Sequence, residues 1–533
     1  MASPEDRPVI GETASLLAAE IVLAAVAAMV YLAGALVDRR EVWRWMALGG
    51  LALAAAALAA VAKEAPAGVA VEADGLARYA RWLALGVGAL LVLLAWRPLP
   101  AHGTAEYLGS LLLAIAGLML VAVARDLVTL FVALEMVSIP TYVLLYLGRR
   151  DVGSQEATVK YFYLSVLASA MLLYGFSFLY GAAGSMDLGE IHHRLAAGPT
   201  GPSGFGAFAR AATVLIFAGL GFRIAAVPFH FYAPDVFQGT STANAGLLSV
   251  VPKIAGMVAL VRLAAAAMPG VQPYAWPVAL VLAALSMTVA NLLALWQDNL
   301  RRLLAYSSIA NAGFLLVGLT AYLACGGTRG PWDGAGGLLF YLVAYALATV
   351  GAFAVLACLG RDDDQVESVE ELAGLAWSAG PIRPVLAVLL AIFLFSLTGV
   401  PPLAGFWGKL AVLASTLSLR AMPPAAAPWL VGLAVLGVLN SAIAAAYYLR
   451  IVAVIFFRTP QGIPAIKGDA WGTLVAAVAC AILVVYIGVR PLPLLRAASD
   501  AVPAAVASDV RGDAPLASGV PVAFSGEIGY LGE

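Results

Sequence analysis

Four ionisable side chains lie deep inside long apolar segments of this sequence: Glu135, Arg223, Lys253 and Lys409. A charge near the centre of a bilayer costs about 2.5 to 3.5 kcal/mol even on the mildest scale, so each one needs a partner or a task. Glu135 has to be protonated or paired, and the always charged Arg223 is its natural partner. Burial disfavours the ammonium form of a lysine, so Lys253 and Lys409 are suited to take up and release protons. These residue types predict a proton path.

Each of these charges also has a simpler interpretation. Glu135 and Arg223 could form a static ion pair that only holds two helices together. Lys253 and Lys409 could extend their ammonium groups to the membrane surface, with their apolar stems buried. We favour the path because the basic groups downstream of the pair are expected at a similar depth in the membrane.

Glycine and proline interrupt two of the apolar segments. Gly219 to Gly239 reads GLGFRIAAVPFHFYAPDVFQG, and Gly399 to Lys409 reads GVPPLAGFWGK. Lipid offers no hydrogen-bond partners, so interrupted backbone persists at that depth only where protein buries it or where it lines a wet cavity. The breaks therefore favour an ion path over an inert anchor.

Further polar side chains could support the path: His230, Lys160, Tyr306, Ser307, Ser308 and Asn311. The last four fall within about one and a half turns of one helix and could hold ordered water, although small residues there also favour helix packing. His230 could pass protons between its ring nitrogens, or it could simply cap the break. Lys160 could join the path or lie at the interface.

Other ionisable residues are expected to lie outside the path. Glu20 has no evident partner in the sequence, whereas Arg262 and Arg450 are expected to reach a membrane interface. Three histidines are expected to be solvated in loops: His102, His192 and His193.

The composition sets the class of protein. The chain has 533 residues, of which 62% are hydrophobic and 11% charged, so it lies outside the range of soluble globular proteins. A net charge of −1 argues against nucleic acid as a partner. The three cysteines are far apart and lack metal-ligand spacing. With no dinucleotide fingerprint, phosphate loop or iron–sulfur pattern in the sequence, we expect no redox cofactor in this chain.

Apolar stretches of about 20 residues recur along most of the chain, and we count about fourteen membrane-spanning helices. The predicted spans are 14–37, 42–62, 79–97, 104–124, 127–147, 157–181, 207–230, 240–265, 274–296, 301–324, 335–359, 382–418, 428–457 and 469–489. The predicted fold is an all-α polytopic membrane protein. The main loop is expected at 184–206, a short amphipathic surface piece at 361–372, and a tail outside the membrane after Pro491.

The first break follows the seventh span and the second interrupts the twelfth. This separation of five helices predicts two inverted five-helix repeats with paired broken helices, a common plan of transporters. The chain then divides into N-terminal helices (1–103), a first repeat (104–265), a second repeat (274–457), and a last helix with the tail (458–533).

Three arginine doublets fall on one side of the membrane under this count: Arg39/Arg40, Arg149/Arg150 and Arg301/Arg302. Positive loops tend to be cytoplasmic, so this side is predicted to face the cytoplasm. An even number of helices then places both termini on the opposite side.

Several motifs resemble the antiporter-like membrane subunits of proton-pumping NADH:quinone oxidoreductase, respiratory complex I, and most closely its subunit N branch. They include ARDLVTLFVALEMVSIPTYVL (124–144), the 160–185 segment that begins KYFYLSVLASA, VPFHFYAPDVFQG (227–239), SVVPK, LLAYSSIA and GVPPLAGFWGK. The resemblance extends from about residue 73 to about residue 458. The form PFHFYAPDVFQG is similar to subunit N, whereas the sister subunits and the cation/proton antiporters typically have a PFHTWLPDAH-like version.

The resemblance implies roles for the buried charges. Glu135 would pair with the basic residue of the seventh span, Lys253 would be the central proton carrier, and Lys409 would exchange protons with the outer side. The family generally has lysine at Arg223 and often histidine at Asn311. Arginine can modulate charge without releasing its proton, and asparagine can orient water without carrying a proton. The segment GTSTANAG (239–246) also lacks the proline that usually follows this break.

The resemblance also implies a setting for the chain. It would be a translocase subunit of NADH:quinone oxidoreductase in a bacterial inner membrane. NADH, FMN, iron–sulfur clusters and quinone would belong to partner subunits, and the neighbours in the membrane would be other subunits of the complex and lipid.

These residues give a mechanistic hypothesis. While Glu135 screens Arg223, Lys253 can hold a proton; separating the pair exposes Lys253 to the arginine charge. At about 6 Å and an effective dielectric constant of about 20, that repulsion is on the order of 2.8 kcal/mol, which favours transfer toward Lys409. Two alternatives stay open: a stand-alone cation/proton antiporter that uses the same lysines, and a non-pumping structural subunit.

Overall fold

The computed structural model describes residues 6–37, 39–61, 69, 71–96, 103–149, 151–196, 205–266, 272–325, 333–360, 366–417, 424–460 and 471–502. Within these ranges the chain is helical apart from short connections and isolated β-bridges. The helices are α1 (Asp6–Leu16), α2 (Ala18–Gly34), α3 (Arg40–Ala60), α4 (Gly75–Leu94), α5 (Thr104–Val123), α6 (Leu127–Gly148), α7 (Val152–Ala183), α8 (Leu188–Ala196), α9 (Phe205–Arg223), α10 (Ala233–Gly239), α11 (Thr242–Ala266), α12 (Gln272–Leu295), α13 (Leu300–Ala324), α14 (Gly334–Cys358), η2 (Val369–Leu372), η3 (Leu375–Trp377), α15 (Ile382–Thr398), α16 (Ala404–Ser415), α17 (Ala427–Phe457), α18 (Trp471–Val489) and α19 (Leu492–Ala501).

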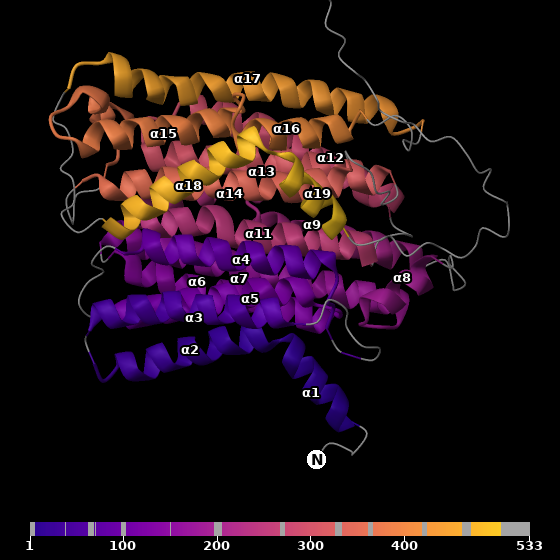
Figure 1. Ribbon diagram of the computed structural model, residues 1–533. Helices are drawn as coiled ribbons and strands as arrows, with labels where there is room; N and C mark the ends of the chain where they lie inside the picture. The colour runs from indigo at the N-terminus through magenta and orange to yellow at the C-terminus, as the bar shows by residue number, and fades with distance from the viewer. Residues whose placement is uncertain are drawn as a thin grey trace, which may run out of the picture.

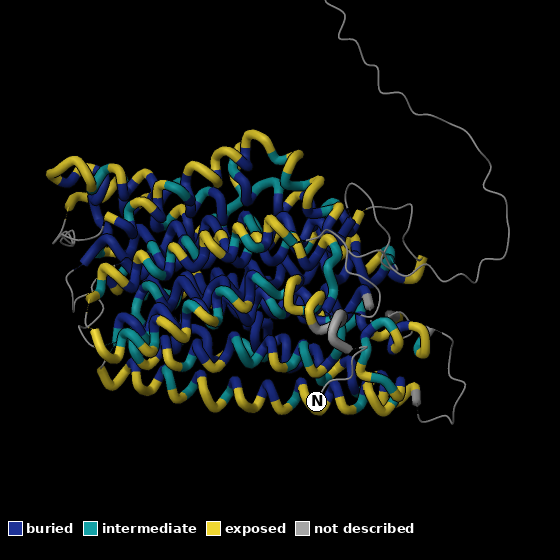
Figure 2. Tube along the Cα trace, turned by 60° about the horizontal axis from the view of Figure 1, so that its bottom comes forward, coloured by how far each residue is buried: buried dark blue, intermediate teal, exposed yellow. Residues whose placement is uncertain are grey.

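The long helices lie side by side with their axes running in roughly one direction, as expected for a chain that crosses a membrane repeatedly (Figure 1). The short helices α1, α8 and α19 gather at one end of this bundle (Figure 1). Buried residues fill its interior, while the outer helices alternate between buried and exposed faces (Figure 2). In a membrane those exposed apolar faces would contact lipid or neighbouring subunits.

The all-α polytopic fold predicted from the sequence is confirmed. Among the described residues, twelve helices are long and apolar enough to cross a membrane, or thirteen if the sharply bent pair of 369–377 and 382–398 counts as one span. The count of about fourteen also included α2, which has only 17 residues, and the interrupted segment made of α15 and α16. The number fourteen and the inverted relation of the two repeats stay predictions.

The structure changes the predicted elements at several places. The first predicted span (14–37) corresponds mainly to α2, which follows the separate helix α1. The predicted loop 184–206 contains α8, and Asp187, the residue before this helix, is held by Arg125 at 2.9 Å. The polar piece predicted at 361–372 ends in η2, where Ser368 and Glu371 form a capping box. Residues 361–365 and the tail from 503 onward lie outside the described residues.

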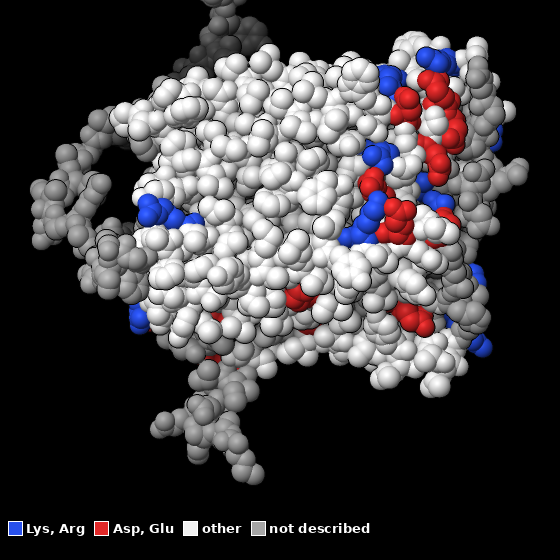
Figure 3. Space-filling view, turned by 180° about the vertical axis from the view of Figure 1, so that it is seen from behind, with Lys and Arg blue, Asp and Glu red and all other residues white. Residues whose placement is uncertain are grey.

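Charged side chains gather toward one edge of the face seen in Figure 3, a broad mostly uncharged band lies beside them, and a few basic side chains lie at the opposite edge. We call the first edge the charged end; it includes Arg149, Asp151, Glu156, Lys160, Asp235, Arg301, Arg302 and Glu367. The turn between α2 and α3, which contains Arg39, lies at the end of the bundle away from α1 and α19 (Figure 1). Arg150, the second member of its doublet, lies outside the described residues.

The centre of the bundle consists of α11, α13 and α14. The apolar stretches of α11 and α13 are buried along their whole length, and that of α14 nearly so. A helix that is apolar all round has no face suited to water and is driven to the interior. Polar side chains on these three helices are therefore enclosed by protein rather than by lipid.

At the first break, α9 ends at Arg223 and α10 begins at Ala233. The intervening backbone is satisfied locally: the N–H groups of Ala225 and Ala226 donate to carbonyls one turn earlier. The N–H of Val227 donates to Ser286 Oγ on α12 at 2.9 Å. The irregular backbone is thus supported by protein, which is the condition for its survival at membrane depth.

At the second break, α15 ends at Thr398 and α16 begins at Ala404. Gly399 adopts φ +94°, a left-handed conformation that favours glycine, and its N–H donates to Phe395 O at 3.0 Å. The N–H of Gly405 donates to Ser396 Oγ at 3.2 Å. Both breaks predicted from glycine and proline are therefore present.

We expect Gly405→Ala to destabilise the protein at the second break. A Cβ at this position would lie 1.9 Å from Ser396 O, a backbone atom that cannot simply move aside. Overpacking of this kind typically costs about 1 to 3 kcal/mol. The melting temperature of the detergent-solubilised protein should fall. The control is Gly86→Ala on α4, because a Cβ there meets nothing within 4 Å; equal stability of the two variants would contradict the expectation.

Candidate functional site

Glu135 on α6 and Arg223 at the end of α9 form an ion pair, as the sequence predicted. Arg223 Nη2 lies 2.7 Å from Glu135 Oε1. The arginine side chain is 4% exposed and the glutamate side chain 22% exposed. Ser169 Oγ on α7 also donates to Glu135 Oε1 at 2.6 Å, so the carboxylate joins three helices.

Arg223 is held by more than its carboxylate. Its guanidinium also donates to Leu134 O at 3.0 Å, to Ser138 Oγ, and to Ser169 Oγ at 3.1 Å. Most of its donors are therefore satisfied by neutral acceptors on α6 and α7. As a result, the guanidinium can keep its position if Glu135 moves or takes up a proton.

The pair lies next to the helix that carries Lys253. Gly256, three residues after Lys253 on α11, has no side chain to separate α11 from the end of α9. A Cβ there would lie 3.5 Å from Arg223 Cβ and 2.6 Å from Ile224 Cγ2. This close approach packs the end of α9, which carries Arg223, against the helix that carries Lys253.

Lys253 is 2% exposed and lies between α13 and α14. Its Nζ donates to Ser308 O and to Ser308 Oγ, both at 2.5 Å, and lies 3.3 Å from the Tyr345 hydroxyl oxygen. The ammonium also lies 4.8 Å from the centre of the Tyr345 ring. Neutral acceptors and an aromatic face thus replace the water that this amine would otherwise bind. Extension of Lys253 to the membrane surface is ruled out.

Asn311 forms the next polar cluster, one turn further along α13. Its Oδ1 accepts a hydrogen bond from the Tyr341 hydroxyl at 2.5 Å, and its Nδ2 donates to Ser307 O at 2.8 Å. Ser307 Oγ and Asn311 Nδ2 both contact the Tyr448 hydroxyl on α17. The predicted serines and Asn311 therefore meet three tyrosines that the sequence reasoning did not include.

Lys409 is 5% exposed and bends back toward the end of α15. Its Nζ donates to Thr398 O at 3.1 Å, one of the carbonyls left without a helical partner at the break. A cation is favoured there by the negative end of the helix dipole. The ammonium also lies 4.7 Å from the centre of the Phe314 ring, whose own centre lies 6.4 Å from that of Tyr341. Lys409 thus adjoins the Asn311 cluster.

The structure places the remaining predicted residues apart from these contacts. Tyr306 is buried on α13, and His230 is half-buried in the first break, where its carbonyl accepts a hydrogen bond from Ala233 N at 2.9 Å. Lys160, for which the sequence left both the path and the interface open, lies at the charged end with its side chain 41% exposed. Its partners Glu156 and Asp235 are also exposed, at 60% and 40%.

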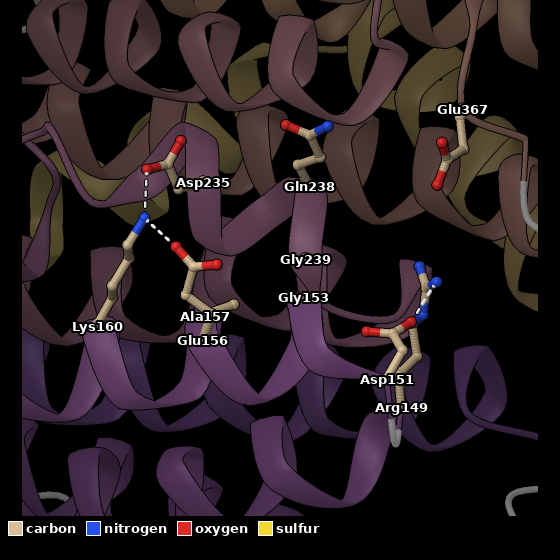
Figure 4. A pocket seen from close by; sticks show the side chains of 10 residues that line it. All are labelled: Arg149, Asp151, Gly153, Glu156, Ala157, Lys160, Asp235, Gln238, Gly239 and Glu367. Carbon is tan, nitrogen blue, oxygen red and sulfur yellow. Dashed lines mark hydrogen bonds and ion pairs between the residues drawn. The ribbon is translucent and has the colours of Figure 1, made fainter.

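Lys160 lines a cavity of about 380 Å³ at the charged end. It points between Glu156 and Asp235, to which it is bonded at 2.7 and 3.0 Å (Figure 4). Asp235 on α10 is also paired with Arg302 on α13 at 2.7 Å. Two cations thus hold the helix that follows the first break.

A buried amide cluster was missed by the sequence reasoning. Asn291 on α12 and Asn440 on α17 are fully buried, and Asn291 Nδ2 lies 3.1 Å from Asn440 Oδ1. The Tyr447 hydroxyl donates to Asn291 Oδ1 at 3.0 Å, and Asn440 Nδ2 donates to Thr288 Oγ1 at 3.2 Å. An asparagine within each of two apolar segments was the signal that could have found this cluster.

The expectations for Glu20 and His192 were wrong. Glu20 does have a partner, because its Oε2 lies 2.6 Å from Arg81 on α4. Arg262, expected to reach a membrane interface, is 3% exposed and binds both carboxylate oxygens of Asp74, the N-cap of α4, at 2.5 and 2.9 Å. His192 is 4% exposed in α8 rather than solvated. His102 lies outside the described residues.

Arg450 is 37% exposed and donates to Gln297 O at 2.5 Å. Groups of three or more histidine, cysteine or acidic side chains that could hold a metal ion were sought among the described residues, and none was found there. The polar side chains that contact one another at the centre carry amines, a guanidinium, a carboxylate, hydroxyls and amides.

Comparisons with known proteins all point to membrane subunits of NADH-quinone oxidoreductase and related antiporters. A family profile described as NADH:quinone oxidoreductase/Mrp antiporter, TM, matches residues 124–457. The chain is 38% identical over 430 residues to NADH-quinone oxidoreductase subunit N of Granulibacter bethesdensis, covering 80% of this chain and 85% of the relative. It is 37% identical over 489 residues to subunit N of Sphingopyxis alaskensis, covering 90% and 96%. A chain of respiratory complex I from Thermus thermophilus superposes with a TM-score of 0.74 and 34% identity, covering 90% of this chain and 99% of that one.

Proposed function

The chain belongs to the family of antiporter-like membrane subunits of NADH-quinone oxidoreductase, with its similar relatives named subunit N, and on this premise we propose that it carries protons across the membrane. The path runs through Glu135, Arg223, Lys253 and Lys409. Oxidation of NADH and reduction of quinone in partner subunits supply the energy.

One observation supports this proposal above all others: Lys253 is buried at the centre of the bundle, and its hydrogen-bond partners among the described residues, Ser308 and Tyr345, are neutral. An uncompensated ammonium in such a place is costly, so a purely structural lysine would be disfavoured against an apolar side chain. A proton carrier has to release its proton as well as hold it, and a lysine without a carboxylate partner can do both.

The ion pair provides a means of control. With Glu135 ionised, the charge of Arg223 is screened, and Lys253 can stay protonated. When Glu135 moves away or is protonated, Arg223 remains fixed by its bonds to Leu134, Ser138 and Ser169 and repels the proton on Lys253. The proton then moves toward Lys409.

The cofactors of the reaction belong elsewhere in the complex. FMN, iron–sulfur clusters, NADH and quinone are assigned to partner subunits, and the neighbouring membrane subunits pass the redox signal to this chain. We further propose that the charged end faces the cytoplasm of a bacterial inner membrane, with both chain termini on the other side.

The test is to measure protons pumped per NADH oxidised by the whole complex in proteoliposomes, with wild-type or substituted chain. Loss of pumping when Lys253 is replaced, with the complex assembled, supports the proposal. Proton exchange driven by an ion gradient in liposomes that contain this chain alone would favour a stand-alone antiporter. Normal pumping by the Lys253 variant would favour a structural role.

Arg223→Lys is expected to keep pumping within about twofold of wild type, because the proposed control uses only the positive charge. Arg223→Met, which removes that charge, should lose most of the pumping. Both are measured as protons per NADH in proteoliposomes. An equal loss in the two variants would show instead that the hydrogen-bonding fork of arginine is essential.

A further inference from the structure

Helix α18 runs obliquely to the long helices of the bundle, and its two ends pack on different parts of the chain (Figure 1). At its start, a Cβ on Gly472 would collide with the ring of Trp96, which follows α4 and is fully buried. Thr473 Oγ1 lies 3.4 Å from the carbonyl oxygens of Leu93 and Leu94, the last two residues of α4. The start of α18 is therefore fixed to the end of α4.

The other end of α18 packs on the second break. Gly488 is the residue before the last of α18, and a Cβ there would collide with Pro402 O and lie 2.7 Å from Leu403 Cα. Both are backbone atoms of the break. Glycine allows two backbones to approach this closely within a membrane because it has no side chain to separate them.

Trp407 on α16 adds a side-chain bond to the same end of α18. Its indole N–H donates to Gly488 O at 2.8 Å. This carbonyl is one of the last four of the helix, which lack a partner within the helix and need one from elsewhere where lipid offers none. The indole therefore satisfies the end of α18 and ties it to the first turn of α16.

The position of Lys409 depends on the elements that α18 contacts. Its Nζ donates to Thr398 O at the end of α15, whereas its backbone belongs to α16, two residues after Trp407. A Cβ on Gly399 would lie 3.2 Å from Lys409 Cδ, so the side chain passes along the break. A shift of α16 relative to the end of α15 would therefore change the distance between the amine and the carbonyl that it binds.

We propose that α18 is a brace that extends from the end of α4 to the second break, with Trp407 and Gly488 as positioning residues for Lys409. This inference rests on the proposed function. The brace acts through the position of the backbone, and the proton itself stays with Lys409 and its partners. Without the brace, the amine would lose its fixed distance to Thr398 O, and with it the pH range in which it exchanges protons.

The first variant is Trp407→Phe in the whole complex, reconstituted in proteoliposomes. Phenylalanine keeps an aromatic ring but has no N–H to donate to Gly488 O. We expect protons pumped per NADH to fall about fivefold, as for the loss of one neutral hydrogen bond, and the pH of half-maximal pumping to move by about half a unit. A purely structural tryptophan would change the yield or thermal stability of the complex and leave the pH profile of assembled complexes unchanged.

Trp377 supplies a chemically matched control. Its indole N–H donates at 2.6 Å to Phe456 O, and Phe456 precedes the last residue of α17, as Gly488 precedes that of α18. This bond lies at the surface, where Trp377 is 74% exposed. Trp377→Phe therefore removes the same kind of bond from another helix end. It should keep the wild-type pH profile and stay within about twofold in protons per NADH.

Gly488→Ala tests the brace without a change to Trp407. The added methyl group would press on the backbone of Pro402 and move α18 away from the break. We expect the pH profile to move as in Trp407→Phe and protons per NADH to fall about tenfold. The control is Gly432→Ala on α17, because a Cβ there meets nothing within 4 Å; it should pump as wild type.

A wild-type pH profile and wild-type protons per NADH in assembled Trp407→Phe complexes would overturn the brace, as would an equal change in Trp377→Phe. If Gly488→Ala does not assemble, as judged by native gel, Trp407→Phe decides. If Trp407→Phe pumps normally while Lys253→Met does not pump, the proposed function stands and only the brace is wrong. Normal pumping in both would refute the proposed function as well.

Discussion

Complexes that carry Lys253→Met are expected to assemble and to pump protons at no more than about one tenth of the wild-type rate. Methionine is of similar length and fills the space of the lysine stem without an amine. The groups left behind remain satisfied, because Ser308 Oγ and the Tyr345 hydroxyl lie 2.7 Å apart and bond each other. Proton uptake per NADH oxidised in proteoliposomes measures the effect.

The variant Lys253→Arg distinguishes the release of a proton by Lys253 from the effect of its positive charge. Arginine keeps the positive charge but cannot give up its proton at accessible pH. If Lys253 is a carrier, the arginine variant should pump as poorly as the methionine variant. Normal pumping by Lys253→Met would refute the proposed function, whereas normal pumping by Lys253→Arg alone would reduce the role of Lys253 to a fixed charge.

Glu135→Gln is expected to reduce redox-coupled pumping strongly, on the order of a hundredfold if screening of Arg223 alone controls Lys253. If the unscreened guanidinium comes within about 6 Å of the amine, at an effective dielectric constant of about 20, it repels the lysine proton by about 2.8 kcal/mol. In this variant Arg223 is never screened, so Lys253 rarely holds a proton to pass on. Protons pumped per NADH are compared at matched rates of NADH oxidation.

Glu20→Gln is the matched control for this change. Glu20 is also a buried carboxylate paired with a buried arginine, at 2.6 Å from Arg81, but it joins α2 to α4 away from Lys253. Removing its charge should lower the thermal stability of the complex and leave protons per NADH unchanged. Unchanged pumping in Glu135→Gln, or an equal loss in both variants, would contradict a specific role for Glu135.

Much of the fold could be predicted from the sequence because a membrane imposes simple rules. Apolar segments of about 20 residues have to form helices, since lipid cannot satisfy open backbone. Glycine and proline within two of them located the breaks after Arg223 and before Ala404, where the structure has them. The pairing of Glu135 with Arg223 could be predicted because an unpaired charge inside a membrane costs free energy.

The sequence by itself determined the class of protein, the helices, the two breaks and the charges that had to be buried. Only the tertiary structure decided which neutral groups form hydrogen bonds with those charges. Ser308 and Tyr345, which contact Lys253, are 55 and 92 residues away from it in the sequence. A helical period tells which residues share a face, but not which other helix that face will contact. The partners of Glu20 and Arg262 and the tyrosines that contact Lys253 and Asn311 therefore emerged only from packing.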